Sequence, residues 1–403
     1  MRALVPCPKA YRAETQRAVD PETTLRMVEG VVPATGITRI ADITGLDRVG
    51  IPVFSCIRPA AADGAISVYN GKGATPLAAR VSAIMEGIER YSAEVVGQPV
   101  TNARFADLGA GVAVDPVDLV LPEYADPDAP LPWVEGRDLV SGDSVLLPAH
   151  AVFHPLPYGT PRLFRTSTNG IASGNTLEEA IFHALAEVIE RDAWSIVEST
   201  RDAGPAVTGA IHPTVRTLLD RFANANVPVV LREITSDVGV PTIAAVADDP
   251  VLRDPALLVI GMGTHTNPAV ACLRALTEVA QSRATQIHGA REDTTTGDLR
   301  RTIGYDRARR LNRYWFEAAR TIEAGVVPAL DTDDFLDDIR LVCDRLRGVG
   351  LDRVYAVDLT RPECGVPVVR VVVPGLECFA MDTERRGDRC RHAGNHRLSR
   401  PEL

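Results

Sequence analysis

The spacing of apolar residues along the chain predicts four long helices. Between Pro76 and Val95, apolar side chains recur every three or four positions, which places them on one face of a helix. Thr176–Val197, Ala269–Ile287 and Phe335–Arg347 have the same spacing. Thr176 or its neighbour Asn175 is suited to cap the second of these helices.

Short runs of apolar and β-branched residues predict strands between and after the helices. These runs are Val229–Glu233, Thr242–Ala247, Leu257–Met262, Val354–Asp358 and Val368–Val373. The stretch 108–157 is rich in Pro, Asp and Gly, which predicts loops with short strands. Helices and strands alternate without a regular βαβ rhythm, so we expect a mixed α/β or α+β fold with mixed sheets.

Composition narrows the class of protein. The 403 residues carry 43 basic and 53 acidic side chains, a net charge of −10, which does not suit broad nucleic-acid binding. No apolar run reaches the roughly 18 to 20 residues of a membrane helix, and the N-terminus lacks the apolar segment of a secretory signal. The 7 cysteines are scattered without a CxxC pair, which is typical of reduced thiols. We therefore expect a cytoplasmic protein with no nucleic-acid or membrane partner.

Two predicted helices contain near-copies of one acidic segment. The segments 83–90 (AIMEGIER) and 184–191 (ALAEVIER) share five of eight residues, and 275–279 (ALTEV) is a weaker third copy. Within each full copy the glutamates stand three positions apart, so they share a helix face. Such close like charges require arginines or a hard cation such as Mg²⁺ to offset them. The alternative is a solvated helix face with Glu–Arg pairs.

A glycine-flanked loop precedes each full copy. The loops are 70–75 (NGKGAT), which contains Lys72, and 167–176 (STNGIASGNT). Glycine lets backbone N–H groups approach a phosphate, and a helix N-terminus adds a favourable dipole. Neither loop has the Walker A spacing, but a glycine-rich loop followed by a glutamate-bearing helix occurs twice.

These segments resemble the nucleotide-binding segments of the YcaO family. The resemblance rests on NGKGATPLAARVSAIMEGIERYSAE, TSTNGIASGNTLEEAIFHALAEVIERDAW and RALTEVAQSR, and it extends from about Tyr11 to about Arg389. It implies a YcaO-type fold whose acidic helices line a site for ATP and Mg²⁺. It also implies an N-terminal part of that unit (1–70) contributing to the nucleotide site, a core domain (71–389) and a basic C-terminal tail (390–403).

The resemblance also implies the roles of individual residues. The expected Mg²⁺ ligands are Glu86, Glu89, Glu179, Glu187, Glu190 and Glu278, of which Glu89, Glu187 and Glu190 are also the expected catalytic residues. The expected nucleotide contacts are Arg17, Thr24, Lys72, Asn175, Arg191 and Arg274. Arg17 and Thr24 enter because the family has a basic residue and a hydroxyl residue at that spacing.

Within the family, the segment from Tyr11 to Ala61 resembles the stand-alone, thioamide-forming branch, which includes an archaeal enzyme that modifies a glycine of methyl-coenzyme M reductase. This implies ATP-dependent activation of a backbone amide of a peptide or protein substrate, with a TfuA-like protein as partner. A homodimer is compatible with this resemblance. The end of the chain, RPEL, lacks the proline-rich ending usual in azoline-forming members. Azoline or amidine formation and a non-catalytic, nucleotide-binding adaptor remain alternatives.

A few further residues carry side chains capable of proton transfer, metal binding or nucleophilic chemistry. Asp47, His183 and Glu89 are candidates for proton transfer. Cys390, His392 and His396 offer zinc-binding side chains, but a frayed basic tail over 385–400 (RRGDRCRHAGNHRLSR) is the preferred interpretation. Cys56 and Cys272 fall at apolar positions and are expected to be buried rather than reactive.

Overall fold

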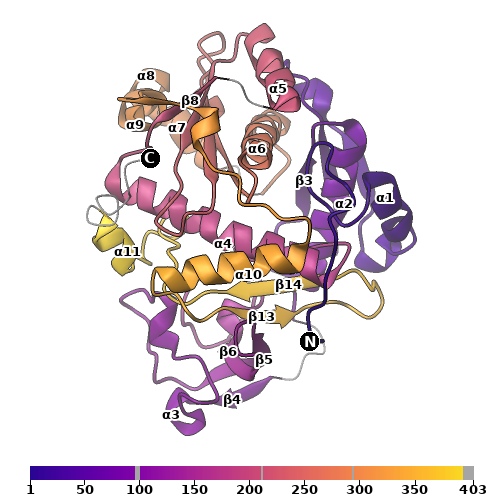
Figure 1. Ribbon diagram of the computed structural model, residues 1–403, viewed down its shortest axis with the longest axis vertical. Helices are drawn as coiled ribbons and strands as arrows, with labels where there is room; N and C mark the ends of the chain where they lie inside the picture. The colour runs from indigo at the N-terminus through magenta and orange to yellow at the C-terminus, as the bar shows by residue number, and fades with distance from the viewer. Residues whose placement is uncertain (96–99, 210–211, 293–294, 394–403) are drawn as a thin grey trace.

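Helix α4 (Leu177–Thr200) runs through the middle of the molecule, as the computed structural model in Figure 1 shows. The structure describes residues 1–95, 100–209, 212–292 and 295–393. The hydroxyl of Thr176 accepts a hydrogen bond from the backbone N–H of Glu179 and so caps the helix, as the sequence predicts. Most of the helix is buried because it packs against strand β14 on one side and strand β11 on the other.

In the described residues the strands form three sheets, mostly antiparallel. The first is β1 (Arg39–Asp42), β2 (Val53–Ile57) and β3 (Val68–Lys72). The second, in spatial order, is β11 (Val259–Thr264), β10 (Thr242–Ala247), β9 (Val229–Glu233), β8 (Ala206–Thr208) and β12 (Thr321–Glu323). The third is β4 (Thr101–Ala103), β5 (Leu131–Asp138), β13 (Tyr355–Asp358), β14 (Val368–Val372) and β7 (Ile171–Ser173), with β6 (Ser144–Pro148) also paired to β5.

The remaining α-helices lie around the sheets and α4. They are α1 (Pro21–Glu29), α2 (Pro76–Ser92), α3 (Phe105–Leu108), α5 (Pro213–Asn224), α6 (Pro268–His288), α7 (Thr295–Ile303), α8 (Tyr305–Leu311), α9 (Arg313–Phe316), α10 (Phe335–Gly348) and α11 (Asp388–Arg391). Among the described residues, no helix combines the length and apolar character that a membrane crossing requires.

The four long helices and the mixed sheets agree with the sequence predictions. Four of the five predicted strands match within one residue at each end. The fifth, predicted at Leu257–Met262, begins later, at Val259, because Pro255–Leu257 forms a 3₁₀ turn that the side chain of Asp254 caps. The stretch 108–157 contributes β5 and β6, an antiparallel pair in the third sheet.

Three strand–turn–helix units bring backbone into contact with backbone. The units are β3–α2, β7–α4 and β11–α6, and each has a glycine facing the helix that follows. A Cβ on Gly174 would lie 2.5 Å from the backbone nitrogen of Ala180, and one on Gly73 would lie 2.6 Å from that of Ala79. Such distances leave no room for a side chain, so glycine sets how closely each helix approaches its strand.

The N-terminal segment, indigo in Figure 1, runs past the end of α10 toward α1. It is fixed by the buried pair of Lys9 Nζ with Asp338 Oδ2 at 2.5 Å, and the backbone N–H of Val5 donates to Glu178 at 2.9 Å. The Cys7 thiol lies 3.2 Å from the hydroxyl of Thr176. These contacts fix the course of the N-terminal segment, and Arg17 lies at the N-terminal end of α4, next to Glu179.

Residues 389 and 390, in the first half of the predicted frayed tail, are packed and paired rather than frayed, which corrects that expectation. Arg389 forms ion pairs with Asp192 at 2.8 Å and with Asp237 at 2.6 Å, and Cys390 is buried. The partners lie far away in sequence, so the local charge pattern did not reveal them. His396, the last of the three zinc-binding candidates, lies outside the described residues, and the ring of His392 is close to the carbonyl of Asp388.

Candidate active site

A cavity of about 550 Å³ lies between helices α2, α4 and α6. Its wall also includes residues of β3, β7 and the N-terminal segment. Every residue that the sequence analysis assigned to ATP or Mg²⁺ lines this one cavity: Arg17, Thr24, Lys72, Glu86, Glu89, Asn175, Glu179, Glu187, Glu190, Arg191, Arg274 and Glu278. The shared location is observed, whereas the individual roles remain predictions.

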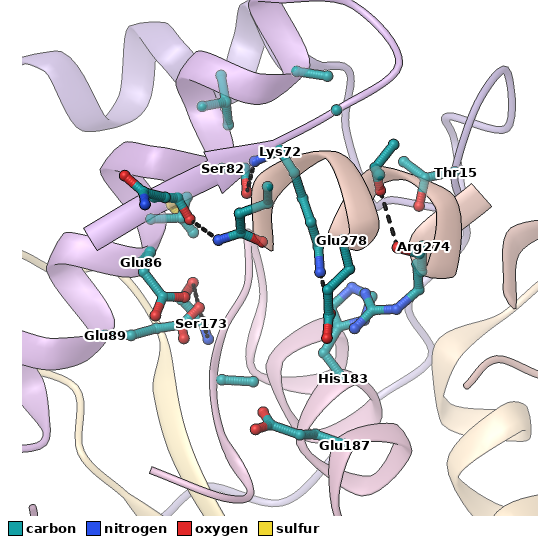
Figure 2. A pocket seen from close by; sticks show the side chains of 18 of the residues that line it. Thr15, Lys72, Ser82, Glu86, Glu89, Ser173, His183, Glu187, Arg274 and Glu278 are labelled. Carbon is teal, nitrogen blue, oxygen red and sulfur yellow. Dashed lines mark hydrogen bonds and ion pairs between the residues drawn. The ribbon is translucent and has the colours of Figure 1, made fainter. Parts of the chain in front are cut away.

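Helix α2 presents Glu86 and Glu89 to the cavity (Figure 2). Glu86 is paired with Arg90, whose Nε lies 2.9 Å from its carboxylate. Glu89 accepts hydrogen bonds from the backbone N–H of Ser173 at 3.1 Å and from its hydroxyl at 2.7 Å. Burial raises the pKa of Glu89 to about 8 because it disfavours the charged carboxylate, and the negative charge of the nearby Glu86 adds to this shift.

Helix α4 supplies Glu187, Glu190 and Arg191. Burial raises the pKa of Glu187 to about 7, although Arg191 opposes this shift from 3.8 Å. Glu190 accepts a hydrogen bond from the backbone N–H of Thr264 at 3.0 Å, which ties α4 to the end of β11. Burial raises the pKa of Glu190 as well. Both glutamates would be stabilised as carboxylates by an additional cation.

Helix α6 forms the opposite wall with Arg274 and Glu278. Figure 2 shows Lys72 reaching across from β3 to Glu278, with which it forms an ion pair. Burial raises the pKa of Glu278, but Lys72 and Arg191 outweigh it, so the net shift is downward. Glu278 is therefore ionised at neutral pH, unlike the protonated state favoured for Glu89.

At the N-terminal end of α4, Glu179 joins several predicted nucleotide contacts. Its carboxylate accepts hydrogen bonds from Arg17 at 3.2 Å, from the backbone N–H of Ala18 at 3.0 Å and from the side-chain amide of Asn175. Burial opposes ionisation, but His183 and Arg17 lower the pKa of Glu179 to about 2. Asn175 also accepts a hydrogen bond from the hydroxyl of Thr24 at 2.8 Å. Glu179 thus already has a full set of partners, which distinguishes it from the other predicted metal ligands.

The residues present fit a polyanion held with a hard cation. The Nε atoms of Arg191 and Arg274 are buried and have no hydrogen-bond partner among the described residues, so both guanidinium groups have a donor available for phosphate oxygens. Carboxylate oxygens are the donors that Mg²⁺ prefers. Among the described residues, no three His, Cys, Asp or Glu side chains converge closely enough to hold a metal ion by themselves. A cation here would share its coordination with phosphate oxygens, as Mg²⁺ commonly does.

The candidates for proton transfer differ in whether they line the cavity. Asp47 is hydrogen-bonded to the buried Arg283 at 2.8 Å, away from the cavity, so it has a structural partner. His183 lines the cavity, but burial and Arg17 lower its pKa to about 3, so it is neutral at physiological pH. Cys56 and Cys272 are buried, as predicted.

Sequence reasoning missed several residues of the cavity. Ser173 donates a hydrogen bond to Glu89, whereas the sequence of its loop draws attention only to the glycines. Gln281 and Thr285 lie seven and eleven positions after Arg274 on α6 and line the same wall. Their helical spacing from Arg274 and Glu278 was the available signal.

Comparison with known proteins identifies the class. A family model described as YcaO cyclodehydratase, ATP- and Mg²⁺-binding, matches residues 70–377. The chain therefore belongs to the YcaO family of ATP-dependent, peptide-modifying enzymes, and ATP and Mg²⁺ are its cofactors.

Individual relatives extend the match beyond the family model. An uncharacterized protein of Methanothermobacter thermautotrophicus is 52% identical over 93% of this chain and 98% of its own length. An uncharacterized protein in the tfuA 3′ region of Rhizobium leguminosarum is 33% identical over 90% of this chain and 88% of its own. The structure of YcaO from Methanopyrus kandleri, bound with AMPPCP and Mg²⁺, has a TM-score of 0.81 and 32% identity and covers 95% of this chain and 98% of that one.

Proposed function

We propose that this enzyme uses ATP to replace the oxygen of a peptide backbone amide with sulfur, forming a thioamide. The observation that carries the sulfur assignment is the 33% identical relative in a tfuA 3′ region, because the resemblance links this branch to a TfuA-like sulfur-delivery partner. The ATP-dependent part of the proposal is supported by the cavity that the three acidic helices share.

An amide needs activation because its carbonyl carbon is a poor electrophile and its oxygen a poor leaving group. In the proposed reaction, hydrosulfide adds to the carbonyl carbon and leaves a tetrahedral oxyanion. That oxyanion takes the γ-phosphoryl group of ATP and releases ADP. The carbon–oxygen bond then breaks, inorganic phosphate and a proton depart, and the carbon–sulfur double bond remains.

The residues of the cavity are assigned to positioning and charge neutralisation, which are the main requirements of phosphoryl transfer. Arg191 and Arg274 donate to phosphate oxygens, and Arg17, Thr24, Asn175 and Lys72 hold the nucleotide. Glu86, Glu89, Glu187, Glu190 and Glu278 are the proposed Mg²⁺ ligands, and Glu179 orients Arg17 and Asn175. Bound Mg²⁺ would offset the negative charge of the phosphates.

Mass spectrometry of candidate peptides tests the proposal. The peptides are incubated with enzyme, ATP, Mg²⁺ and sulfide, with and without a TfuA-like protein. A mass gain equal to sulfur minus oxygen, dependent on both ATP and sulfide, is the expected result. Unmodified peptides in every combination, although ATP is bound, would instead favour an adaptor.

Cyclodehydration to an azoline or amidine is the second candidate, and the description of the matching family model favours it. In that reaction the nucleophile belongs to the peptide, so the product loses one water and sulfide is not required. The same mass measurement separates the two products.

A further inference from the structure

Cys378 differs from the other cysteines of the chain in its accessibility. Cys7, Cys56, Cys272, Cys343, Cys364 and Cys390 are all buried, whereas Cys378 is partly exposed. Its segment is fixed against α4 on both sides of the thiol. The backbone N–H of Glu377 donates to Asp192 at 3.1 Å, and that of Ala380 donates to the Ser195 hydroxyl at 3.0 Å. The thiol is therefore held beside the helix that carries Glu187 and Glu190.

One buried polar side chain contacts this thiol, a second lies within electrostatic reach of it, and both have unused hydrogen-bonding capacity. The amide nitrogen of Asn169 lies 3.7 Å from Cys378 Sγ, and the amide oxygen of the same group is buried with no partner in the described part of the chain. Arg370 donates from Nη1 to the carbonyl of Ser167 at 2.7 Å, while its Nε is also buried and meets no partner within the ranges that the structure describes. Asn169 is only 9% exposed and Arg370 only 7%. Buried donors and acceptors without partners are uncommon, and they indicate a place for a ligand or a modified side chain.

The same two residues lie close to a residue of the cavity wall, Ile171. Asn169 precedes the cavity-lining Ile171 by two positions, and Arg370 is the register partner of Ile171 between β14 and β7. Burial lowers the pKa of Arg370 to about 10, and Glu187 and Cys378 both oppose that shift. Arg370 therefore lies within electrostatic reach of both the acidic wall of the cavity and the thiol. It is a buried cation with little compensating negative charge.

We propose that Cys378 is a sulfur-carrying residue that holds a sulfur atom as a persulfide next to Asn169. A persulfide is an anion at neutral pH, so it would supply the negative charge that Arg370 lacks. The side-chain amide of Asn169 would donate to the added sulfur. The inference rests on the proposed thioamide function, because only an external sulfur nucleophile requires a carrier near the cavity.

The loading and unloading steps balance without an external oxidant. In loading, the Cys378 thiolate attacks the outer sulfur of a persulfide or polysulfide donor, the sulfur–sulfur bond of the donor breaks, and the donor leaves as a thiolate. In unloading, a small thiolate attacks Cys378 Sγ, and the outer sulfur takes a proton and leaves as hydrosulfide, the nucleophile of the proposed reaction. A second small thiol then reduces the mixed disulfide and restores Cys378.

Sulfur uptake is tested on the full-length protein by exposing it briefly to inorganic polysulfide, removing the excess, alkylating and digesting. The Cys378 peptide is expected to carry one extra sulfur atom. Cys364→Ser, which removes a buried cysteine away from the cavity, should retain this label, and Cys378→Ser should lack it. Loss of the charged partner in Arg370→Gln should slow loading about tenfold. Extra sulfur spread over several cysteines, or absent from Cys378, would overturn the proposal.

Sulfur transfer is tested in a single turnover of the loaded enzyme with ATP, Mg²⁺, peptide and a small thiol, without added sulfide. Loaded wild-type enzyme should form up to one equivalent of thioamide, and Cys378→Ser treated in the same way should form none. Parallel reactions with free sulfide keep the two proposals distinguishable. Thioamide from free sulfide but none from loaded enzyme rejects the carrier. Absence of thioamide from either source, with the extra sulfur present on Cys378, rejects the thioamide function instead.

Discussion

Glu89 and Ser173 join two of the three strand–turn–helix units, because the carboxylate on α2 accepts both the backbone N–H and the hydroxyl at the end of β7. The first acidic helix is thereby fixed to the strand that leads into the second. These hydrogen bonds favour the carboxylate, yet burial and Glu86 still raise its pKa to about 8. Glu89 therefore holds a proton at neutral pH unless a cation displaces it.

Mg²⁺ binding should release protons below about pH 8. Deprotonation of Glu89 must accompany coordination, so affinity should rise with pH by up to about tenfold per unit and level off above the pKa. Calorimetry with a non-hydrolysable ATP analogue in two buffers of different ionisation enthalpy measures the proton count. Ser173→Ala should move the plateau to higher pH, because it removes a hydrogen bond to the carboxylate. Binding heats that are independent of buffer would exclude Glu89 as a ligand.

Glu187→Gln should abolish ATP consumption while stabilising the nucleotide-free protein. Burial raises the pKa of Glu187 from 4.5 to about 7, so between these values the folded state holds a proton that the unfolded chain has lost. Stability should therefore fall as pH rises through this window, and the neutral variant should avoid a penalty of about 1 to 3 kcal/mol near pH 8. Urea unfolding at pH 5 and pH 8 measures the difference, which should shrink at the lower pH.

The exposed Glu123 provides the matched control for that variant. Glu123→Gln should leave both unfolding curves and ATP consumption unchanged. Near-normal ATP turnover in Glu187→Gln would remove Glu187 from the proposed metal ligands.

Arg274→Gln should raise KM for ATP by about tenfold to a hundredfold, because it removes a charged donor whose Nε has no partner within the described residues. Arg274→Lys should recover part of this loss, since it keeps the charge without the fork of donors. Steady-state ATP hydrolysis with saturating peptide measures the effect. The exposed Arg310→Gln serves as the control, and an equal KM in both variants would contradict a phosphate contact.

Lys9→Met should destabilise the protein by about 3 to 5 kcal/mol, because it leaves the Asp338 carboxylate buried without its cation. Asp338→Asn in the same chain should restore part of this stability. Arg12→Met removes a more exposed pair with Asp333 on the same segment and should cost less than about 1 kcal/mol. Denaturant titration ranks the variants. If Lys9→Met matches Arg12→Met, the N-terminal segment is not held through this pair.

Local periodicity accounts for what the sequence could predict. The apolar stripe of α4 and the spacing of Glu187 and Glu190 are properties of a few helical turns, so they can be recognised without knowing the partners. The resemblance to the YcaO family then implied that the acidic helices line one site for ATP and Mg²⁺, and both line the same cavity.

Long-range pairing accounts for what the sequence could not predict. The frayed-tail expectation treated Arg389 as one of many arginines near the end of the chain, whereas its aspartate partners lie on α4 and after β9. Asp47 is a candidate for proton transfer in the sequence, because nothing near it indicates the pair that it forms with the distant Arg283. Charged residues follow no periodic rule, so only the fold shows which charges are already paired.

The glycine contacts between strand and helix have a consequence for engineering the nucleotide site. Gly73 on the first unit and Gly174 on the second leave no space between backbones, so α2 and α4 cannot be moved closer to their strands, and any added side chain would push them away. The separation of the cavity walls is thus set by main-chain contact. Enzymes redesigned for bulkier ATP analogues should therefore be sought by trimming side chains such as Met85 and Val81, which line the cavity, rather than by altering these turns.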